Sequence, residues 1–259
     1  MLTLHPIPAF TDNYIWCLHD NESAYVVDPG QADPVMDYLH DRSLILKGIL
    51  ITHHHWDHVS GIEALLQEYP GIPVWGPALE TIPGRTQSLT EGDSVELSWG
   101  IQFSVFEVPG HTLGHIAYYG ENTPVGNLLF CGDTLFSSGC GRLFEGTPEQ
   151  MHQSLQNLAA LPVDTKVCCT HEYTTSNLAF AQAVEPYNQD IQDRVAQVSA
   201  LREQNLPSLP STLALELLVN PFLRVTESTV LQSLQEKCGK RPANEVESFA
   251  KLREWKDNF

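Results

Sequence analysis

Short hydrophobic runs, each ended by Gly, Pro, Asn or Asp, recur along the chain up to about residue 172. Runs of this length that stop at turn-forming residues are typical of buried β-strands. The pattern therefore predicts strands at residues 25–27, 48–51, 73–75, 103–108, 128–131 and 167–169.

Hydrophobic residues at helical spacing lie between some of these runs and dominate after about residue 175. The clearest example starts at Thr147, which can cap a helix, has Glu149 in the first turn, and continues to Leu161. Further helices are predicted at residues 34–42, 61–69, 177–184, 191–204, 226–238 and 244–259. Since strands give way to helices near residue 174, we expect an α/β domain over residues 1–174 and a smaller all-helical domain over residues 175–259.

The composition fits a folded chain and argues against two classes of partner. Of the 259 residues, 42% are hydrophobic and 18% charged, which is enough apolar material for a packed core. Lys and Arg total 14 against 32 Asp and Glu, a net charge of -18. This balance disfavours binding to nucleic acid phosphates or to an anionic membrane through a basic patch. No apolar run approaches the roughly 20 residues that span a bilayer.

The N-terminal segment and the cysteines indicate a cytoplasmic protein. No basic residue precedes the first apolar stretch, and Pro6 and Pro8 interrupt it, so we expect the start of the fold and not a signal peptide. None of the six cysteines forms a CxxC pair, and a chain of this length does not need disulfides to fold. We therefore expect free thiols in a reducing compartment.

The most informative segment is HHHWDH, residues 53–58, which directly follows the predicted strand at 48–51. The carboxyl ends of buried strands are where α/β folds gather ligands. In an extended chain His53, His55 and Asp57 share one face, and a turn after Asp57 would return His58 to it. Imidazoles with a carboxylate suit zinc and similar metals. A histidine-rich surface loop is the alternative, and the HxHxDH spacing after a buried strand disfavours it.

Three more candidate ligands, His111, Asp133 and His171, each follow a predicted strand, so several strand ends are expected to converge. The residues suffice for two metal ions that share a water molecule. One ion would be held by His53, His55 and His111, the other by Asp57, His58 and His171, with Asp133 bridging both. Zinc is the expected metal, and iron and manganese are alternatives. His115 is a candidate for supporting the ligands.

The HxHxDH motif with the later His, Asp and His resembles the metallo-β-lactamase superfamily. The chain resembles its glyoxalase II family, the hydroxyacylglutathione hydrolases, more closely. The resembling segments are Asn13-Tyr14, residues 28–30, 52–58, 109–115, 131–147, 168–174, 220–224 and 253–259. This resemblance implies an αβ/βα sandwich followed by a helical domain. It also implies hydrolysis of S-D-lactoylglutathione to glutathione and D-lactate, the second step of methylglyoxal detoxification.

The resemblance further implies a set of glutathione contacts: Arg142, Tyr173, Arg253 and Lys256. Glutathione conjugates carry two carboxylates, so local cations have to hold them against the negative charge of the chain. Arg142 stands where some members have Lys, which keeps the charge and changes its geometry. Phe144 stands where some members have Tyr, which removes a hydroxyl contact.

The implied reaction needs no serine or cysteine nucleophile, because a water molecule activated by the metal ions attacks the thioester. Asp57 and Asp133 are the expected catalytic carboxylates. Asp57 is favoured as a ligand over a general base. The leaving thiolate, whose parent thiol has a pKa of about 8.5, departs without a proton. Cys140 is interpreted as a packing residue.

Several other functions remain open at this point. A lactonase, a β-lactamase and a glutathione-linked persulfide dioxygenase share the fold. A B1 β-lactamase would usually carry Cys in place of Asp133, and a mononuclear iron dioxygenase would not need Asp57, His58 and His171. A binding protein for metal or glutathione without turnover is the non-enzyme alternative. We expect a monomer that acts on a small glutathione thioester.

Overall fold

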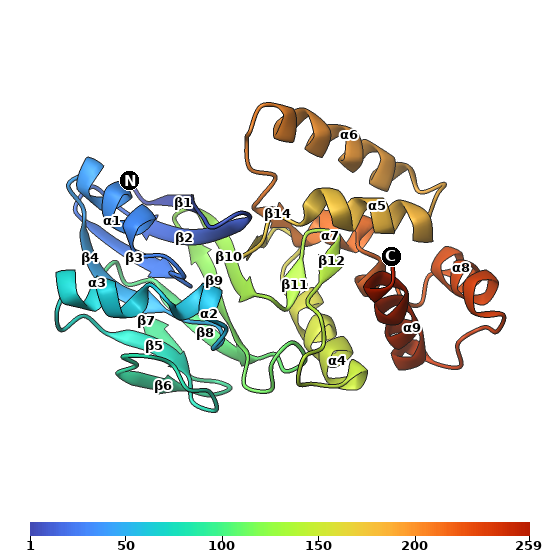
Figure 1. The fold of residues 1–259 in the computed structure, drawn as a ribbon, viewed down its shortest axis with the longest axis horizontal. Coiled ribbons are helices and arrows are strands. Elements are labelled where there is room, and N and C mark those ends of the chain that lie inside the picture. Colours follow the sequence, from blue (N-terminus) through green and yellow to red (C-terminus); the bar gives the residue numbers. More distant parts are fainter. The chain divides into compact units, whose positions relative to one another are not determined.

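The computed structural model describes all 259 residues, which form two compact units (Figure 1). The first unit consists of Met1–Val108, Leu113–Gly132 and Cys168–His171. The second consists of Pro109–Thr112, Asp133–Val167 and Glu172–Phe259. The polypeptide thus passes repeatedly from one unit to the other, and a single boundary between residues 174 and 175 stays a prediction.

The first unit contains a six-stranded sheet whose strands follow one another in chain order. Its first three strands are antiparallel and the rest are parallel: β1 (Thr3–Ala9), β2 (Asn13–His19), β3 (Ser23–Val27), β4 (Ile45–Leu50), β5 (Val74–Pro77) and β6 (Gln87–Leu89). The connections carry α1 (Asp33–Asp41) and α3 (Ile62–Glu68). Their buried side chains pack with those of the strands in one hydrophobic cluster, so both helices cover a face of this sheet.

A second, antiparallel set of strands completes the first unit. It consists of β7 (Ser94–Glu96), β8 (Gln102–Glu107), β9 (Ile116–Thr123) and β10 (Gly126–Gly132), with the last residues of β13 (Lys166–Cys169) beside β10. Buried hydrogen bonds join the two sheets. The Trp16 indole donates to the Cys169 carbonyl at 2.9 Å, and the Tyr118 hydroxyl to the Ile51 carbonyl at 2.8 Å. The first unit is therefore a sandwich of two sheets.

The second unit is mainly helical. It contains α4 (Pro148–Ala159), α5 (Thr174–Val184), α6 (Gln189–Glu203), α7 (Leu213–Val219), α8 (Ser228–Cys238), α9 (Glu245–Asp257), a 3-10 turn (Pro221–Leu223) and the short strands β11 (Leu135–Phe136), β12 (Gly139–Cys140) and β14 (Ser211–Thr212). Helix α9 packs against α4 and α8. Buried Asn220 donates to the carbonyls of Phe136 and Gly139 and thereby holds the β11–β12 hairpin.

The predicted helices and strands are confirmed, with ends that differ by a few residues. Thr147 caps α4 in a reciprocal pair of hydrogen bonds with Gln150, as the capping prediction required. The pattern missed β1, β2, β6, β7 and β9, the helices α2 and α7, and the two-residue strands. Every residue of β2 is buried, so it shows no alternation, and Pro6 and Pro8 interrupt β1. All six cysteines are free. No helix combines the length and the hydropathy that a membrane span requires.

Candidate metal centre and cation-lined cavity

The segment from His53 to His58 changes conformation halfway. Strand β4 ends at Leu50, and the short helix α2 (Trp56–Val59) begins directly after His55. The His58 N–H donates to the His55 carbonyl at 2.9 Å. The expected alternation of an extended chain is therefore wrong beyond His55, because Asp57 already lies in a helical turn. That turn, and not the face of a strand, sets the position of Asp57.

Gly30 makes room for this helical turn. A Cβ atom at residue 30 would lie 1.8 Å from the Asp57 carbonyl oxygen and 2.5 Å from its carbon. Such distances are far inside van der Waals contact, so only glycine allows the two backbone segments to approach each other here. This gives the Asp-Pro-Gly motif at residues 28–30 a physical role.

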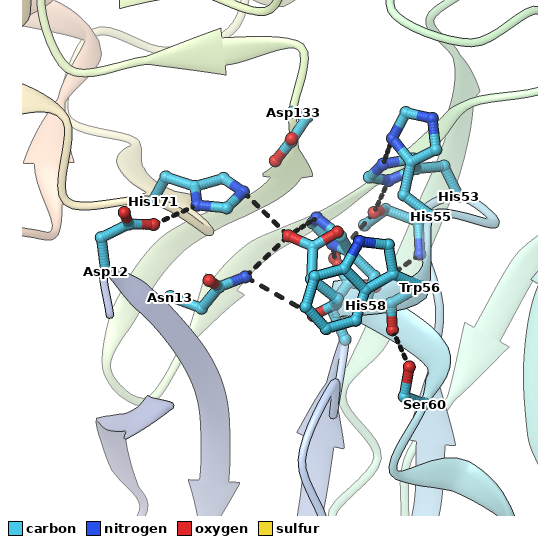
Figure 2. Close-up of polar contacts among 12 residues, drawn as sticks. Asp12, Asn13, His53, His55, Trp56, His58, Ser60, Asp133 and His171 are labelled. Atoms are coloured by element: carbon cyan, nitrogen blue, oxygen red, sulfur yellow. Dashed lines mark hydrogen bonds and ion pairs between the residues drawn. The ribbon is translucent and has the colours of Figure 1, made fainter. Parts of the chain in front are cut away.

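Asp57, His58 and His171 form a cluster in the first unit. Figure 2 labels the two histidines. The Asp57 Oδ2 atom lies 3.7 Å from His58 Nε2 and 3.4 Å from His171 Nε2. His58 and His171 are buried, and His171 follows directly after β13 and Thr170. Two imidazole nitrogens and a carboxylate oxygen at these separations are a donor set that fits a divalent metal ion.

His53 and His55 add two imidazoles to the same unit. His53 Nε2 lies 3.0 Å from His55 Nδ1, and the rings of His53 and His58 have centroids 4.1 Å apart. The buried His115 ring stacks on His53 with centroids 4.5 Å apart. The first unit thus gathers five of the seven predicted ligands, with His115 as support for His53.

Asp28 orients His58, a contact between residues 30 positions apart that no local sequence pattern indicates. Its buried carboxylate accepts hydrogen bonds from the Thr52 N–H at 2.8 Å and hydroxyl at 2.7 Å, and Oδ2 lies 3.0 Å from His58 Nδ1. A carboxylate at one ring nitrogen fixes the proton there and leaves the other nitrogen as a metal donor. This arrangement keeps His58 Nε2 available on the side of Asp57.

Asp12 and Asn13, in the turn between β1 and β2 and at the start of β2, support the other two members of the cluster. Asp12 Oδ1 lies 2.8 Å from His171 Nδ1, and the Asn13 side-chain amide donates to Asp57 Oδ2 at 3.0 Å (Figure 2). Asn13 stood in a segment that marked the resemblance, but local sequence gives no sign that it reaches Asp57.

Asp28→Asn is expected to weaken metal binding and kcat/KM by about 10- to 100-fold, the usual cost of losing such a supporting carboxylate. The amide keeps the size of the side chain and removes its charge and one acceptor. Competition with a chelator measures the affinity. Asp41→Asn, at an exposed site in α1, should leave both quantities unchanged. Wild-type metal affinity in Asp28→Asn would contradict the orienting role.

The second unit holds the other two predicted ligands at a cavity of about 630 Å³. His111 Nε2 lies 3.4 Å from Asp133 Oδ2, and His111 Nδ1 lies 2.8 Å from the Arg142 carbonyl oxygen. Gly141 lets the loop close here, since a Cβ atom at that residue would lie 2.0 Å from the Asp133 carbonyl oxygen. His111 and Asp133 thus meet at the wall of one cavity.

All the predicted glutathione contacts, Arg142, Tyr173, Arg253 and Lys256, line this same cavity. Arg253 is only 5% exposed and donates to the Cys140 carbonyl at 3.0 Å, while its Nη2 lies 2.8 Å from Asp257 Oδ1. The Lys256 ammonium donates to the Ser176 carbonyl at 3.1 Å. Burial, followed by the charges of Arg253 and Arg142, lowers the pKa of Lys256. Three cations and two carboxylates, Asp133 and Asp257, therefore line the cavity, and Asp257 lies 3.7 Å from Arg142 as well as beside Arg253.

Cys140 also lines the cavity, and it is buried. Burial raises the pKa of its thiol to about 11, although the nearby Arg253 guanidinium acts in the opposite direction. The side chain is therefore a neutral thiol near pH 7 and a poor nucleophile. This supports its interpretation as a packing residue.

Two family models together match nearly the whole chain. The model described as "Metallo-beta-lactamase superfamily" matches residues 10–171, and "Hydroxyacylglutathione hydrolase C-terminus" matches residues 172–259. The hydroxyacylglutathione hydrolase of Photobacterium profundum is 54% identical over 260 residues, and that of Cupriavidus metallidurans 53% over 266 residues, each alignment covering 100% of both chains.

Among solved structures, TTHA1623 in a di-iron-bound form is 25% identical, with a TM-score of 0.59. The match covers 85% of this chain and 100% of that one. The expected fold, a metallo-β-lactamase domain followed by a helical C-terminal domain, is confirmed by the two family models.

Proposed function

Because the chain belongs to the hydroxyacylglutathione hydrolase family of the metallo-β-lactamase superfamily, we propose that it is a glyoxalase II. Its reaction is the hydrolysis of S-D-lactoylglutathione to glutathione and D-lactate. The observation that carries this proposal is the cavity of the second unit, where His111 and Asp133 stand beside Arg142, Arg253 and Lys256. Hydrolysis of a glutathione thioester requires metal ligands near the thioester carbonyl and cations that bind the carboxylates of glutathione.

The donors support two divalent metal ions per chain. When bound, such ions polarise the thioester carbonyl and activate the attacking water molecule. We assign His53, His55 and His111 to one ion, Asp57, His58 and His171 to the other, and Asp133 to both. Zinc suits imidazole and carboxylate donors, and the di-iron-bound relative supports iron as the alternative.

Within this centre Asp57 serves as a ligand and not as a general base. Its Oδ2 atom accepts a hydrogen bond from the Asn13 amide and faces the Nε2 atoms of both His58 and His171. Held by the Asn13 amide and bound to a metal ion together with these two nitrogens, this oxygen would have little capacity to take up a proton. Loss of the thiolate leaving group needs no proton donor either, because its parent thiol has a pKa of about 8.5.

Arg253 and Lys256 have different roles in holding the tripeptide. Arg253 is tied to the Cys140 carbonyl and to Asp257, so it also stabilises the fold of the cavity wall. Lys256 makes a single hydrogen bond, to the Ser176 carbonyl, and exchange of this bond for a substrate carboxylate leaves the fold intact. Tyr173, 37% exposed, packs edge-to-face against Phe136 and adds a hydroxyl at the rim.

Lys256→Ala is expected to raise KM for S-D-lactoylglutathione and leave kcat nearly unchanged, because the carboxylates of glutathione do not change during the reaction. A hydrogen bond to a charged group is worth roughly 1.5–3 kcal/mol, which corresponds to about 10- to 100-fold in kcat/KM. A small thioester that lacks the tripeptide is the control substrate and should be indifferent. An unchanged KM would remove Lys256 from the glutathione site, and an equal loss on the small thioester would indicate misfolding.

The lowered pKa of Lys256 predicts a dependence of KM on pH. Lysine binds a carboxylate only while protonated, so binding weakens as the pH rises through the pKa of the ammonium. Because that pKa is depressed, KM of the wild type should begin to rise at a lower pH than an ordinary lysine would cause. Lys256→Arg stays charged and should delay this rise, as KM measured between about pH 7 and 10 would show. Identical profiles would contradict the role of Lys256 charge.

The alternative functions differ from a glyoxalase II in the result expected when the protein is incubated with the glutathione thioester. A protein that binds metal or glutathione without turnover would release no thiol from the thioester. A lactonase would hydrolyse a lactone in preference to it. We also propose that the protein is a cytoplasmic monomer, which the six free cysteines support as far as the compartment is concerned.

A further inference from the structure

Two aromatic side chains, Phe10 and Trp56, are exposed together in the first unit. Trp56 is 65% and Phe10 39% exposed, and their rings meet edge-to-face with centroids 4.9 Å apart. Aromatic surface left in water forgoes the free energy of its burial. Adjacent exposed rings therefore indicate a surface that contacts an apolar group of a ligand or partner.

Both rings belong to the segments that build the metal centre. Trp56 lies between His55 and Asp57 in sequence, and its carbonyl accepts hydrogen bonds from the N–H and hydroxyl of Ser60 at the end of α2 (Figure 2). Phe10 lies two residues before Asp12, whose carboxylate contacts His171. A Cβ atom on Gly30 would lie 2.8 Å from Phe10 Cε2 and 1.8 Å from the Asp57 carbonyl oxygen. The Phe10 ring and the backbone of Asp57 thus close over the same glycine.

The backbone of Phe10 is strained in a way that keeps this arrangement. Its φ angle is +49°, in the left-handed region that bulky residues rarely adopt. Its N–H donates to the side chain of Gln31, which follows Gly30 directly. Strained backbone that persists beside a functional site often serves that site.

We propose that Phe10 and Trp56 form the surface on which the acyl group of the thioester lies, and that they favour apolar acyl groups. This inference rests on the proposed function. The thioester carbonyl has to reach the metal centre. Because the acyl group is bonded directly to that carbonyl, it lies within a few ångströms of the metal-binding side chains. The acyl group is the part of the substrate that aromatic rings suit.

The test compares two substrates, S-D-lactoylglutathione and S-D-mandeloylglutathione, whose acyl groups differ in a methyl against a phenyl group. The ratio of their kcat/KM values, mandeloyl over lactoyl, should fall about tenfold in Trp56→Ala, as expected for loss of an aromatic contact and its buried area. Phe10→Ala should lower the ratio less, and Trp56→Phe should restore most of it. Tyr187→Ala removes an aromatic ring that is 95% exposed in the second unit and should leave the ratio unchanged.

The outcomes separate this inference from the function on which it rests. An unchanged ratio in both Trp56→Ala and Phe10→Ala, with lactoyl hydrolysis retained, would overturn the acyl surface and leave the glyoxalase assignment standing. An equal loss of kcat/KM on both substrates, together with a lower metal content, would mean that Phe10 and Trp56 support the metal centre. That result would also overturn the acyl surface. If the wild type hydrolysed neither thioester, the proposed function and the inference would fail together.

Discussion

Asp133→Ala is expected to lose both metal ions and to lower kcat/KM for S-D-lactoylglutathione by at least about a thousandfold, the upper range for removal of a single electrostatic group from a reaction centre. The expectation follows from its assignment to both ligand sets. Each of the other predicted ligands is assigned to one ion, so replacing one of them should remove less of the second ion than Asp133→Ala does. Elemental analysis of the purified variant gives the metal content directly.

Asp37→Ala is the matched control, since Asp37 is an exposed carboxylate on α1 of the first unit. It should keep close to two ions per chain and wild-type turnover. Circular dichroism of both variants checks that the fold is retained. Wild-type metal content in Asp133→Ala would show that Asp133 does not bridge the ions, and full activity with a single ion would contradict the dinuclear centre.

Gly30→Ala is expected to disrupt the Asp57–His58–His171 cluster and to lower activity by about 100-fold, because an error of about 1 Å in a reacting centre costs that much. The added methyl group would meet backbone atoms of Asp57 at 1.8 and 2.5 Å, and backbone cannot rotate away as a side chain can. Asp57 would therefore be displaced relative to both histidines. We also expect a lower melting temperature from the overpacking.

Gly76→Ala, in β5 of the same unit, is the control for this change. Its Cβ atom would meet only side-chain atoms, the nearest being Ile82 Cγ1 at 3.2 Å, which can shift by a few tenths of an ångström. The two variants should therefore differ strongly in metal content and activity. Retention of full activity in Gly30→Ala would mean that the α2 turn tolerates displacement and that Asp57 is not held as described.

The candidate ligands could be predicted because the segments that carry them follow buried strands. A hydrophobic run followed by His or Asp is a local pattern that the sequence shows directly. As expected, His53 comes shortly after β4 and His171 shortly after β13. Local pattern failed beyond His55. The turn of α2 depends on contact with Gly30, which lies 27 residues away in sequence and leaves no mark on the segment itself.

The residues that orient the ligands could not be predicted from the sequence either, because their contacts also join distant segments. Asp28 meets His58 across 30 positions, Asn13 meets Asp57 across 44, and Asp12 meets His171 across 159. Each of these three polar residues stands at a strand end or in a turn, where Asp and Asn are common because they favour turn conformations. Only the sheet order, which brings β2, β3 and β4 side by side, distinguishes them from ordinary turn residues.

The exposed aromatic pair illustrates a further limit. The ring contact between Phe10 and Trp56 joins segments 46 positions apart, so no local pattern indicates it. Their exposure is a property of the fold, since hydrophobic residues are buried by default and the sequence offers no reason to exempt these two.

Hydrolysis of the thioester is measured by incubating the purified, metal-loaded protein with S-D-lactoylglutathione and quantifying both products. We expect glutathione and D-lactate in equal amounts, with turnover that stops when a chelator removes the metal and returns when zinc or iron is restored. Absence of thiol release from protein loaded in turn with zinc, iron and manganese would contradict the assignment as a glutathione thioester hydrolase.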